Sequence, residues 1–277
     1  MRLIVPFAPA GTTDIIARML AQHLSNAWGQ QVVVDNRPGG GTLIAAELVK
    51  QAAADGHTLL MGGTSLIINT NAATALSGGS ARVDVQRDFA PIILCATGAN
   101  VVSVRYASPI GTLKDLIALA KAKPGKLTFG SSGVGSSNHL SGEVLKMMAG
   151  IDLVHVPYKG NTPALADAAG GQIDMVFAGV PTLQPFLKSR HLRALAIGSK
   201  QRFITVPDVP TFEEAGLPGY EMPNFFGLLA PAGTAGYIIA KINRDTQIAL
   251  TRPEIGQQLI ADGANPGGGT PAQFGEF

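Results

Sequence analysis

The chain has 277 residues, a length that fits one large or two medium-sized domains with an ample buried core. Hydrophobic residues make up 46% of it and charged residues 14%, which argues against a disordered chain. The formal net charge is +2 and the lysines and arginines form no basic run, so nucleic acid is not an expected partner.

Strands and helices are predicted to alternate from the start of the chain, because apolar runs alternate with segments that carry one apolar helical face. Strands are expected at 2–7, 32–34 and 58–61, and helices at 14–26 and 43–53. Loops are expected at 62–65 and at 77–88, where Gly and Ser are followed by charged residues. The apolar stretch 92–104 is too long for one average strand, so we expect it to cross between domains.

The same alternation restarts after this crossing. Helices are expected at 112–123, 137–149, 163–169 and 183–188, and strands at 127–129, 154–156, 175–178 and 192–197. A proline-rich loop is expected at 207–218, with a short helix at 212–215. A second apolar run at 225–230 precedes helices at 236–250 and 253–262, which we expect to return to the first half.

This alternation predicts an α/β protein with a mostly parallel sheet in each of two lobes. Lobe 1 is expected to comprise residues 1–101 and 224–277, and lobe 2 residues 102–223. The crossover strands are expected near 96–105 and 221–230.

Two segments share a construction that suits anion binding. The segments 2–14 and 127–138 each have an apolar strand, then a loop of small residues, then the start of a helix. A helix N-terminus leaves backbone N–H groups unpaired and carries a partial positive charge, and small residues let an anion approach it closely. We therefore expect two cradles that hold one anionic ligand.

The second cradle is rich in hydroxyl groups. It contains Ser131, Ser132, Ser136, Ser137 and Asn138 together with three glycines. Hydroxyls and backbone N–H groups suit a carboxylate or a phosphate. His139 follows just inside the helix, where it either touches the ligand or has a structural role. Two further loops, at Thr64-Ser65 and at Tyr158 to Gly160, also follow predicted strands, where α/β sheets bind ligands.

Several catalytic and metal-binding patterns are absent from the sequence. It has no Gly-x-Ser-x-Gly motif, no phosphate-binding loop, no dinucleotide-binding glycine motif and no His-Glu-x-x-His motif. The single cysteine, Cys95, forms no internal disulfide, and no spacing of Cys and His predicts zinc. We expect no cofactor and no metal, and no run of about 20 apolar residues predicts a membrane span.

At this point the motifs, taken together, resemble the Bug/TctC binding proteins of tripartite tricarboxylate transporters. The resemblance is carried by seven collinear motifs that span essentially the whole chain. They are Arg2-Leu-Ile-Val-Pro-Phe-Ala-Pro-Ala-Gly-Thr-Thr-Asp14, Val34-Asp-Asn-Arg-Pro-Gly39, Ala54-Asp-Gly-His-Thr-Leu-Leu-Met-Gly62, Gly125-Lys-Leu-Thr-Phe-Gly-Ser-Ser-Gly133, His155-Val-Pro-Tyr-Lys-Gly160, Pro207-Asp-Val-Pro-Thr-Phe-Glu-Glu-Ala-Gly-Leu-Pro-Gly-Tyr220 and Phe226-Gly-Leu-Leu-Ala-Pro-Ala-Gly233.

The resemblance implies a two-lobed periplasmic-binding-protein fold of type II, a Venus flytrap that closes on its ligand. It implies a small organic carboxylate as ligand, membrane permease subunits as partners and a periplasmic location. It also implies an exported precursor whose leader is removed, and a last helix that continues beyond Phe277. We further expect a monomer. The ligand-binding residues expected from the motifs are Phe7, Pro9, Ala10, Gly11, Thr12, Asp14, Thr64, Ser65, Ser131, Ser132, Gly135, Ser136, Ser137, Asn138, His139, Tyr158, Gly160 and Ala178.

Two positions depart from the family pattern. The first loop has Pro9-Ala10-Gly11 where relatives usually have Pro-Gly-Gly, so a methyl group is expected to crowd the ligand or shift a bridging water. The segment Met175 to Gly179 lacks an Asp that many relatives carry and that pairs with a ligand ammonium. This favours simple mono- or dicarboxylates, or an aromatic acid, over amino acids. The segments 64–71 and 178–182 are expected to be loops that set the pocket size.

Two functions from different classes fit the residues. The leading hypothesis is a solute-binding protein that closes by a hinge when a carboxylate bridges both lobes. The alternative is an enzyme on the same fold that acts on an acyl or phosphoryl anion at Ser131 or Ser132. Such an enzyme needs a base within hydrogen-bond reach of a serine, and His139 is the only candidate nearby in sequence.

Overall fold

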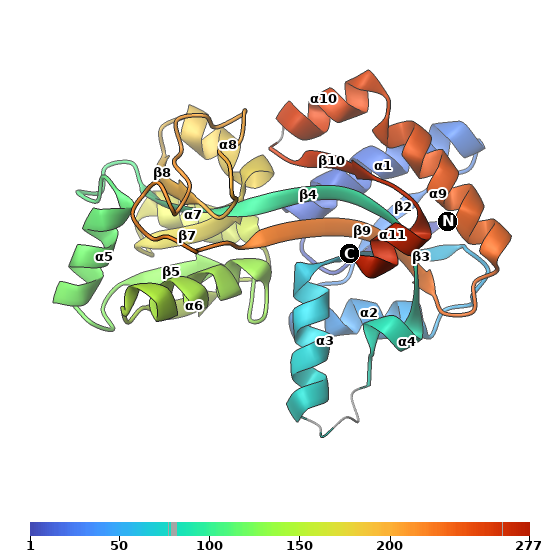
Figure 1. The fold of residues 1–277 in the computed structure, drawn as a ribbon, viewed down its shortest axis with the longest axis horizontal. Coiled ribbons are helices and arrows are strands. Elements are labelled where there is room, and N and C mark those ends of the chain that lie inside the picture. The colour runs from blue at the N-terminus through green and yellow to red at the C-terminus, as the bar shows by residue number, and fades with distance from the viewer. Residues whose placement is uncertain (77, 79–81, 262) are drawn as a thin grey trace. The chain divides into compact units, whose positions relative to one another are not determined.

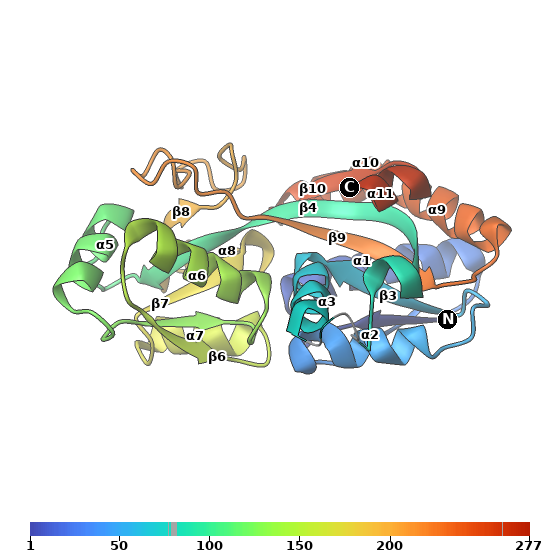
Figure 2. The same ribbon diagram turned by 60° about the horizontal axis from the view of Figure 1, so that its bottom comes forward.

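The computed structural model describes residues 1–76, 78, 82–261 and 263–277, and it divides into two compact units. Unit 1 comprises Met1–Thr97, Phe225–Ile260 and Asn265–Phe277, and unit 2 comprises Gly98–Asn224 and Ala261–Ala264. The chain therefore passes from unit 1 to unit 2 after Thr97 and returns after Asn224. Figures 1 and 2 show the elements of both units.

Unit 1 begins with three strand–helix pairs. Their elements are β1 (Arg2–Val5), α1 (Thr12–Trp28), β2 (Val33–Asn36), the 3-10 helix η1 (Gly40–Thr42), α2 (Leu43–Lys50), β3 (Thr58–Gly63) and α3 (Thr64–Leu76). The three strands are parallel in the order β2-β1-β3, so their carboxyl ends lie at one edge of the sheet. Helix α1 forms here because Ile16, Leu20 and Leu24 recur on one face, and all three are buried.

Later segments complete the sheet of unit 1. They are α4 (Val85–Asp88), β4 (Phe89–Arg105), β9 (Pro223–Pro231), α9 (Gly236–Leu250), α10 (Pro253–Ala261), β10 (Asn265–Gly268) and α11 (Pro271–Glu276). Strand β9 pairs antiparallel with β3, and β10 pairs antiparallel with β4. Both views show β10 lying along β4, with α9 and α10 beside it (Figures 1 and 2).

Unit 2 repeats the construction of unit 1. Its elements are α5 (Leu113–Ala122), β5 (Thr128–Ser131), α6 (Ser137–Ala149), β6 (Val154–Pro157), α7 (Asn161–Gly170), β7 (Met175–Gly179), α8 (Val180–Lys188) and β8 (Leu192–Ile197). Strands β6, β5 and β7 are parallel in that order, which matches β2, β1 and β3, and the long strand β4 runs antiparallel to β7. Helices α6, α7 and α8 therefore all begin at the carboxyl edge of this sheet.

The core of unit 2 lies on both faces of its sheet, because side chains alternate along each strand. On β7, Met175 and Phe177 join one apolar cluster, while Val176 and Ala178 join the other. In unit 1, a cluster around Ile4, Leu60, Phe89 and Leu229 packs α2 and α3 against the sheet.

The structure confirms the α/β class and corrects several local predictions. The expected loop at Thr64-Ser65 is the first turn of α3, and the loop at 64–71 is most of that helix. Residues 212–215 form hydrogen-bonded turns and not a helix. Residues 178–182 are the end of β7 and the first turn of α8. The expected surface loop 77–88 contains helix α4, and its residues 77 and 79–81, like 262, lie outside the described residues.

Candidate functional site

The first candidate site is the carboxyl edge of the sheet in unit 1, where α1 and α3 begin. The predicted residues Phe7, Pro9, Ala10, Gly11, Thr12 and Asp14 form the loop and first turn between β1 and α1. Thr64 and Ser65 open α3 directly after β3, which is the neighbour of β1 in the sheet. The fold thus brings the two predicted segments of unit 1 to the same sheet edge.

The buried carboxylate of Asp14 holds the first loop in place. It accepts hydrogen bonds from the backbone N–H of Ala10 (2.8 Å), from Nε of Arg18 (2.8 Å) and from Nδ2 of Asn36 (2.8 Å). Nδ2 of Asn36 also donates to the carbonyl of Phe7 at 2.9 Å. Burial acts to raise the pKa of Asp14, but these hydrogen bonds and the charge of Arg18 outweigh it and lower the pKa. Asp14 is therefore a loop anchor, with its carboxylate already occupied.

Ala10 adopts a left-handed backbone conformation, with φ at 61°. L-residues with a side chain pay a steric cost of about 1–2 kcal/mol there, and glycine does not. This explains in physical terms why a glycine suits this position of the loop. The methyl group of Ala10 is exposed to solvent.

Helix α1 begins without a side-chain cap. Gly11 occupies the N-cap position and offers no capping group. The adjacent Thr12 is 8% exposed, and its hydroxyl oxygen is buried without a hydrogen-bond partner among the described residues. An uncapped first turn keeps its N–H groups available to an anion, which is the property that a carboxylate cradle needs.

The second candidate site is the serine loop, residues 131–138, at the carboxyl edge of the sheet in unit 2. The structure uses all four serine hydroxyls inside the protein. Ser132 Oγ donates to Oδ1 of Asn138 at 2.7 Å, Ser136 Oγ caps α6 by accepting from the N–H of His139 at 3.2 Å, and Ser137 Oγ accepts from Nδ2 of Asn224 at 3.2 Å. These bonds fix the hydroxyl groups and shape the loop, and the N-terminus of α6 adds the positive end of a helix dipole, which attracts an anion.

Ser131 is fully buried at the end of β5. Its Oγ lies 2.7 Å from Nε2 of His155, accepts from the N–H of Gly133 at 3.1 Å and lies 3.2 Å from the carbonyl of Gly133. His155 lies in one of the family motifs but is not among the residues expected to bind the ligand. The parallel register of β5 and β6, which sets Phe129 opposite His155, brings the two side chains together.

The ring of His155 stacks against two other rings. Its centroid lies 4.0 Å from that of His139 and 4.9 Å from that of Phe129. Burial and the neighbouring His139 lower the pKa of His155 to about 4, and burial lowers the pKa of His139 as well. Both imidazoles are therefore neutral at pH 7.

His139 is not the base that the enzyme hypothesis requires. Its Nδ1 accepts from the N–H of Gly135 at 3.2 Å, and its Nε2 lies 3.7 Å from Glu143. The proton of the neutral ring therefore sits on Nε2, directed at Glu143, and neither ring nitrogen bonds Ser131 or Ser132 in the described part of the chain. At the serine loop, His155 is the imidazole that reaches a hydroxyl, that of Ser131, and Ser131 is buried.

The remaining predicted residues of unit 2 fall at the ends of β6 and β7. The hydroxyl of Tyr158 donates to Asp167 at 2.7 Å, and burial together with Asp167 raises the pKa of Tyr158 to about 12. Gly160 is the N-cap of α7 and offers no side-chain cap. The side chain of Ala178 is fully buried in the apolar cluster behind β7, one residue before the end of that strand.

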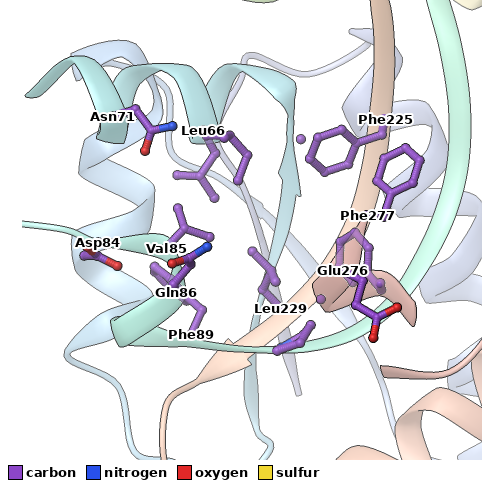
Figure 3. A pocket seen from close by; sticks show the side chains of 15 residues that line it. Leu66, Asn71, Asp84, Val85, Gln86, Phe89, Phe225, Leu229, Glu276 and Phe277 are labelled. Atoms are coloured by element: carbon purple, nitrogen blue, oxygen red, sulfur yellow. The ribbon is translucent and has the colours of Figure 1, made fainter. Parts of the chain in front are cut away.

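A pocket of about 640 Å³ lies elsewhere in unit 1. Figure 3 shows Leu66, Phe89, Phe225, Leu229 and Phe277 around it, with the acidic side chains of Asp84 and Glu276 also at the pocket. None of the predicted ligand-binding residues lines this pocket. In the described ranges, no cluster of His, Cys, Asp and Glu suits a metal ion, and no helix is long and apolar enough to cross a membrane.

Two similar α/β units, each with helices that begin at the carboxyl edge of a parallel sheet, match the architecture of periplasmic solute-binding proteins. Residues 16–277 match the sequence model of the tripartite tricarboxylate transporter family receptor, TctC. The chain belongs to this family. It is a solute-binding receptor of the TctC type, and the family and its structural neighbours are solute-binding proteins and not enzymes.

Individual relatives agree with this assignment. Protein BugT of Bordetella pertussis is 36% identical over 278 residues, which cover 100% of this chain and 84% of BugT. Rpa4515 of R. palustris, solved with adipate, has a TM-score of 0.93 and 37% identity over 99% of this chain and 90% of that one. MatC of Rhodopseudomonas palustris, with bound malate, has a TM-score of 0.88 and 32% identity over 96% and 89%.

Proposed function

We propose that this receptor captures a small organic carboxylate and holds it at the two sheet edges described above. The observation that carries the proposal is the uncapped N-terminus of α1, with the loop before it fixed by Asp14 and the buried hydroxyl of Thr12 beside it. Such a terminus binds a carboxylate with backbone donors and a helix dipole and needs no cationic side chain. Ligands seen in the neighbours, adipate and malate, belong to this chemical class.

The second edge supplies the other half of the proposed site. At the serine loop, the hydroxyls of Ser132, Ser136 and Ser137 are held by protein partners, so the ligand would meet a fixed arrangement of backbone groups. Fixed donors cost little ordering free energy when the ligand binds. We propose that the ligand engages both edges and that the two units close on it by a hinge, because a ligand favours the state in which it makes more contacts.

The proposed ligand is a mono- or dicarboxylate or an aromatic acid, and not an amino acid. The segment Met175 to Gly179 carries no acidic side chain that would pair with a ligand ammonium. We further propose that the receptor works in the periplasm and delivers its ligand to the permease subunits of a tripartite transporter, as the name of its family implies.

A thermal-shift screen tests this proposal. The purified protein is heated with a panel of carboxylates that includes adipate, malate and benzoate. Aspartate and glutamate are included for comparison, because they carry an ammonium group as well. A ligand that binds the folded state alone raises the unfolding temperature, and the rise grows with the logarithm of the ligand concentration above Kd. We expect a shift with at least one simple carboxylate. Shifts with the amino acids alone would overturn the proposed ligand class, and no shift with any carboxylate would overturn the proposed function.

A further inference from the structure

We propose that Asn100 and Asn224 are positioning residues that couple the serine loop to the two strands on which the chain crosses between units. This inference rests on the proposed function, because it gives hinge closure a physical link to the ligand. It concerns two side chains that neither the motifs nor the family assignment singles out.

The first link is a buried chain of amide and hydroxyl groups. Ser132 Oγ donates to Oδ1 of Asn138, and Nδ2 of Asn138 donates to Oδ1 of Asn100 at 3.0 Å. Nδ2 of Asn100 then donates to Oγ of Ser141 at 3.1 Å, and that hydroxyl donates to the carbonyl of Ser137 at 2.8 Å. The chain of bonds leaves the serine loop, reaches β4 and returns to α6 one turn further along.

Asn100 and Asn138 are both buried, at 2% and 4% exposure. Each nitrogen and oxygen atom of their two side-chain amides has a hydrogen-bond partner. A buried polar network that is fully satisfied favours one arrangement strongly, because any displacement leaves a desolvated donor or acceptor without a partner. The first turn of α6 therefore cannot move relative to β4 around Asn100 without breaking this network.

Asn100 lies close to the first crossing point. It is the third residue of unit 2 on β4, which leaves unit 1 after Thr97. Its register partner is Gly179, the last residue of β7 and the N-cap of α8. One side chain thus ties the crossing strand to the helix that carries the serine loop, at the same sheet edge.

The second crossing point has an equivalent link. Asn224 is the last residue of unit 2 on β9, and its Nδ2 donates to Oγ of Ser137, the first residue of α6, at 3.2 Å. The next residue, Phe225, belongs to unit 1, and its N–H donates to Oγ1 of Thr64, the first residue of α3, at 3.2 Å. The adjacent residues Asn224 and Phe225 are therefore each hydrogen-bonded to the first residue of a helix, α6 in unit 2 and α3 in unit 1.

A carboxylate held at the first turn of α6 would contact the same turn that the side chains of Asn100 and Asn224 hold. We expect these hydrogen bonds to transmit a ligand-induced shift of that turn to β4 and β9, at the points where these strands change unit. Loss of the Asn100 or Asn224 amide keeps the helix that carries the cradle but loosens its first turn from β4 or β9. The closed state is then selected less strongly, and affinity falls.

The test compares Asn224→Ala and Asn100→Leu with the parent and with Asn243→Ala. Asn243 is the control, because its Nδ2 likewise donates hydrogen bonds inside the protein, to the carbonyls of Ile92 and Gly269, but all three residues lie in unit 1. Spin labels are attached through Ile44→Cys in unit 1 and Met147→Cys in unit 2, both exposed, while the natural Cys95 is buried. Label-to-label distances are measured with and without adipate, and adipate affinity is measured by calorimetry.

We expect adipate to change the distance distribution in the parent and in Asn243→Ala, and to change it much less in both test variants, with affinity about 10-fold weaker. If the variants respond to adipate as the parent does, the coupling is absent while the proposed function stands. If the parent binds adipate without a change in the distance between the labels, the protein does not close on this ligand. That result contradicts both the proposed hinge closure and the proposed coupling.

A second arm needs no ligand. Hydrogen exchange is measured at the backbone amides of 137–141 in the free protein. We expect faster exchange there in Asn224→Ala, whose half-buried position makes misfolding a small risk, and parent-like exchange in Asn243→Ala. Parent-like exchange in both Asn224→Ala and Asn100→Leu would overturn the proposal, whatever the ligand proves to be.

Discussion

The Oγ atom of Ser131 lies 2.7 Å from Nε2 of His155, and the serine that forms this pair is fully buried. A serine beside an imidazole is often part of a nucleophilic site, but a nucleophile must reach its substrate. Here the hydroxyl also bonds the backbone of Gly133, so the pair fixes the start of the serine loop. Its role in this receptor is to hold the loop in shape.

Removal of this hydroxyl is expected to lower stability. Ser131→Ala leaves Nε2 of His155 and the N–H of Gly133 without their partner, which costs about 1–3 kcal/mol of unfolding free energy. Urea denaturation of the variant and the parent measures the difference. Ser199→Ala, at a half-buried serine whose hydroxyl donates to the carbonyl of Gln201, serves as the control with an expected change below about 0.5 kcal/mol. Equal midpoints for Ser131→Ala and the parent would contradict the structural role.

The stacked histidines are expected to make stability depend on pH. An unfolded histidine titrates near pH 6.5, whereas in the folded protein the pKa of His155 is about 4 and that of His139 is also lowered. The unfolded chain therefore binds more protons in this window, so the free energy of unfolding falls as pH drops from about 6.5 to about 4. We expect a loss of about 1–2 kcal/mol after allowance for partial solvent exposure.

Two variants separate this effect from the titration of the rest of the protein. His155→Gln removes the titrating ring, and its stability should fall less steeply between pH 6.5 and pH 4 than that of the parent. Asn243→Ala, at a residue that does not titrate, should keep the slope of the parent. Identical slopes for His155→Gln and the parent would show that this ring does not titrate as described.

The left-handed backbone of Ala10 is expected to cost stability that a glycine at this position would restore. Ala10→Gly removes about 1–2 kcal/mol of steric cost at φ 61° but adds about 0.4–1 kcal/mol of conformational entropy to the unfolded chain. The expected net effect is a gain in unfolding free energy of between zero and about 1.6 kcal/mol, measured by urea denaturation. Ala10→Val, with a β-branched side chain in the same conformation, should be clearly less stable than the parent. A stable valine variant would mean that the loop adopts another conformation.

Asp14 is expected to be the strongest polar anchor in unit 1. Asp14→Ala removes three hydrogen bonds to one buried carboxylate, and we expect a loss of about 2–4 kcal/mol together with weaker carboxylate binding. Asp35→Ala is the control, because Asp35 pairs with Arg2 and Arg37 at the surface, where such pairs contribute about 1 kcal/mol or less. Similar losses in both variants, by denaturation, would contradict the assigned role of Asp14.

The regular parts of this fold could be predicted because their patterns are strong. Helices at 137–149 and 236–250 and the strand at 192–197 have the predicted limits, since each has clear apolar periodicity or a glycine or cap at its ends. Helix α3 was missed because its sequence, rich in Thr, Asn and Ile, has no polar face. It is held by side-chain bonds such as Thr70 to the carbonyl of Leu66, and by burial of Leu66.

The candidate site could be predicted only where its residues are adjacent in sequence. The serine loop and the loop before α1 are continuous segments, so their composition predicted them. His155 is 24 positions from Ser131 and meets it only through the pairing of β5 with β6. Asn100 and Asn224 were missed for the same reason. Strand pairing decides which distant side chains meet, and the pattern of apolar residues does not say which strands are neighbours in the sheet.

The central claim is that this receptor binds a simple carboxylate, and calorimetric titration tests it most directly. Adipate, malate and benzoate are titrated separately into the parent protein and into Asp14→Ala, with aspartate and glutamate as comparison ligands. We predict saturable heat with 1:1 stoichiometry for at least one simple carboxylate, and weaker binding of that ligand by Asp14→Ala. Saturable binding of aspartate or glutamate with no heat from any simple carboxylate would contradict the account.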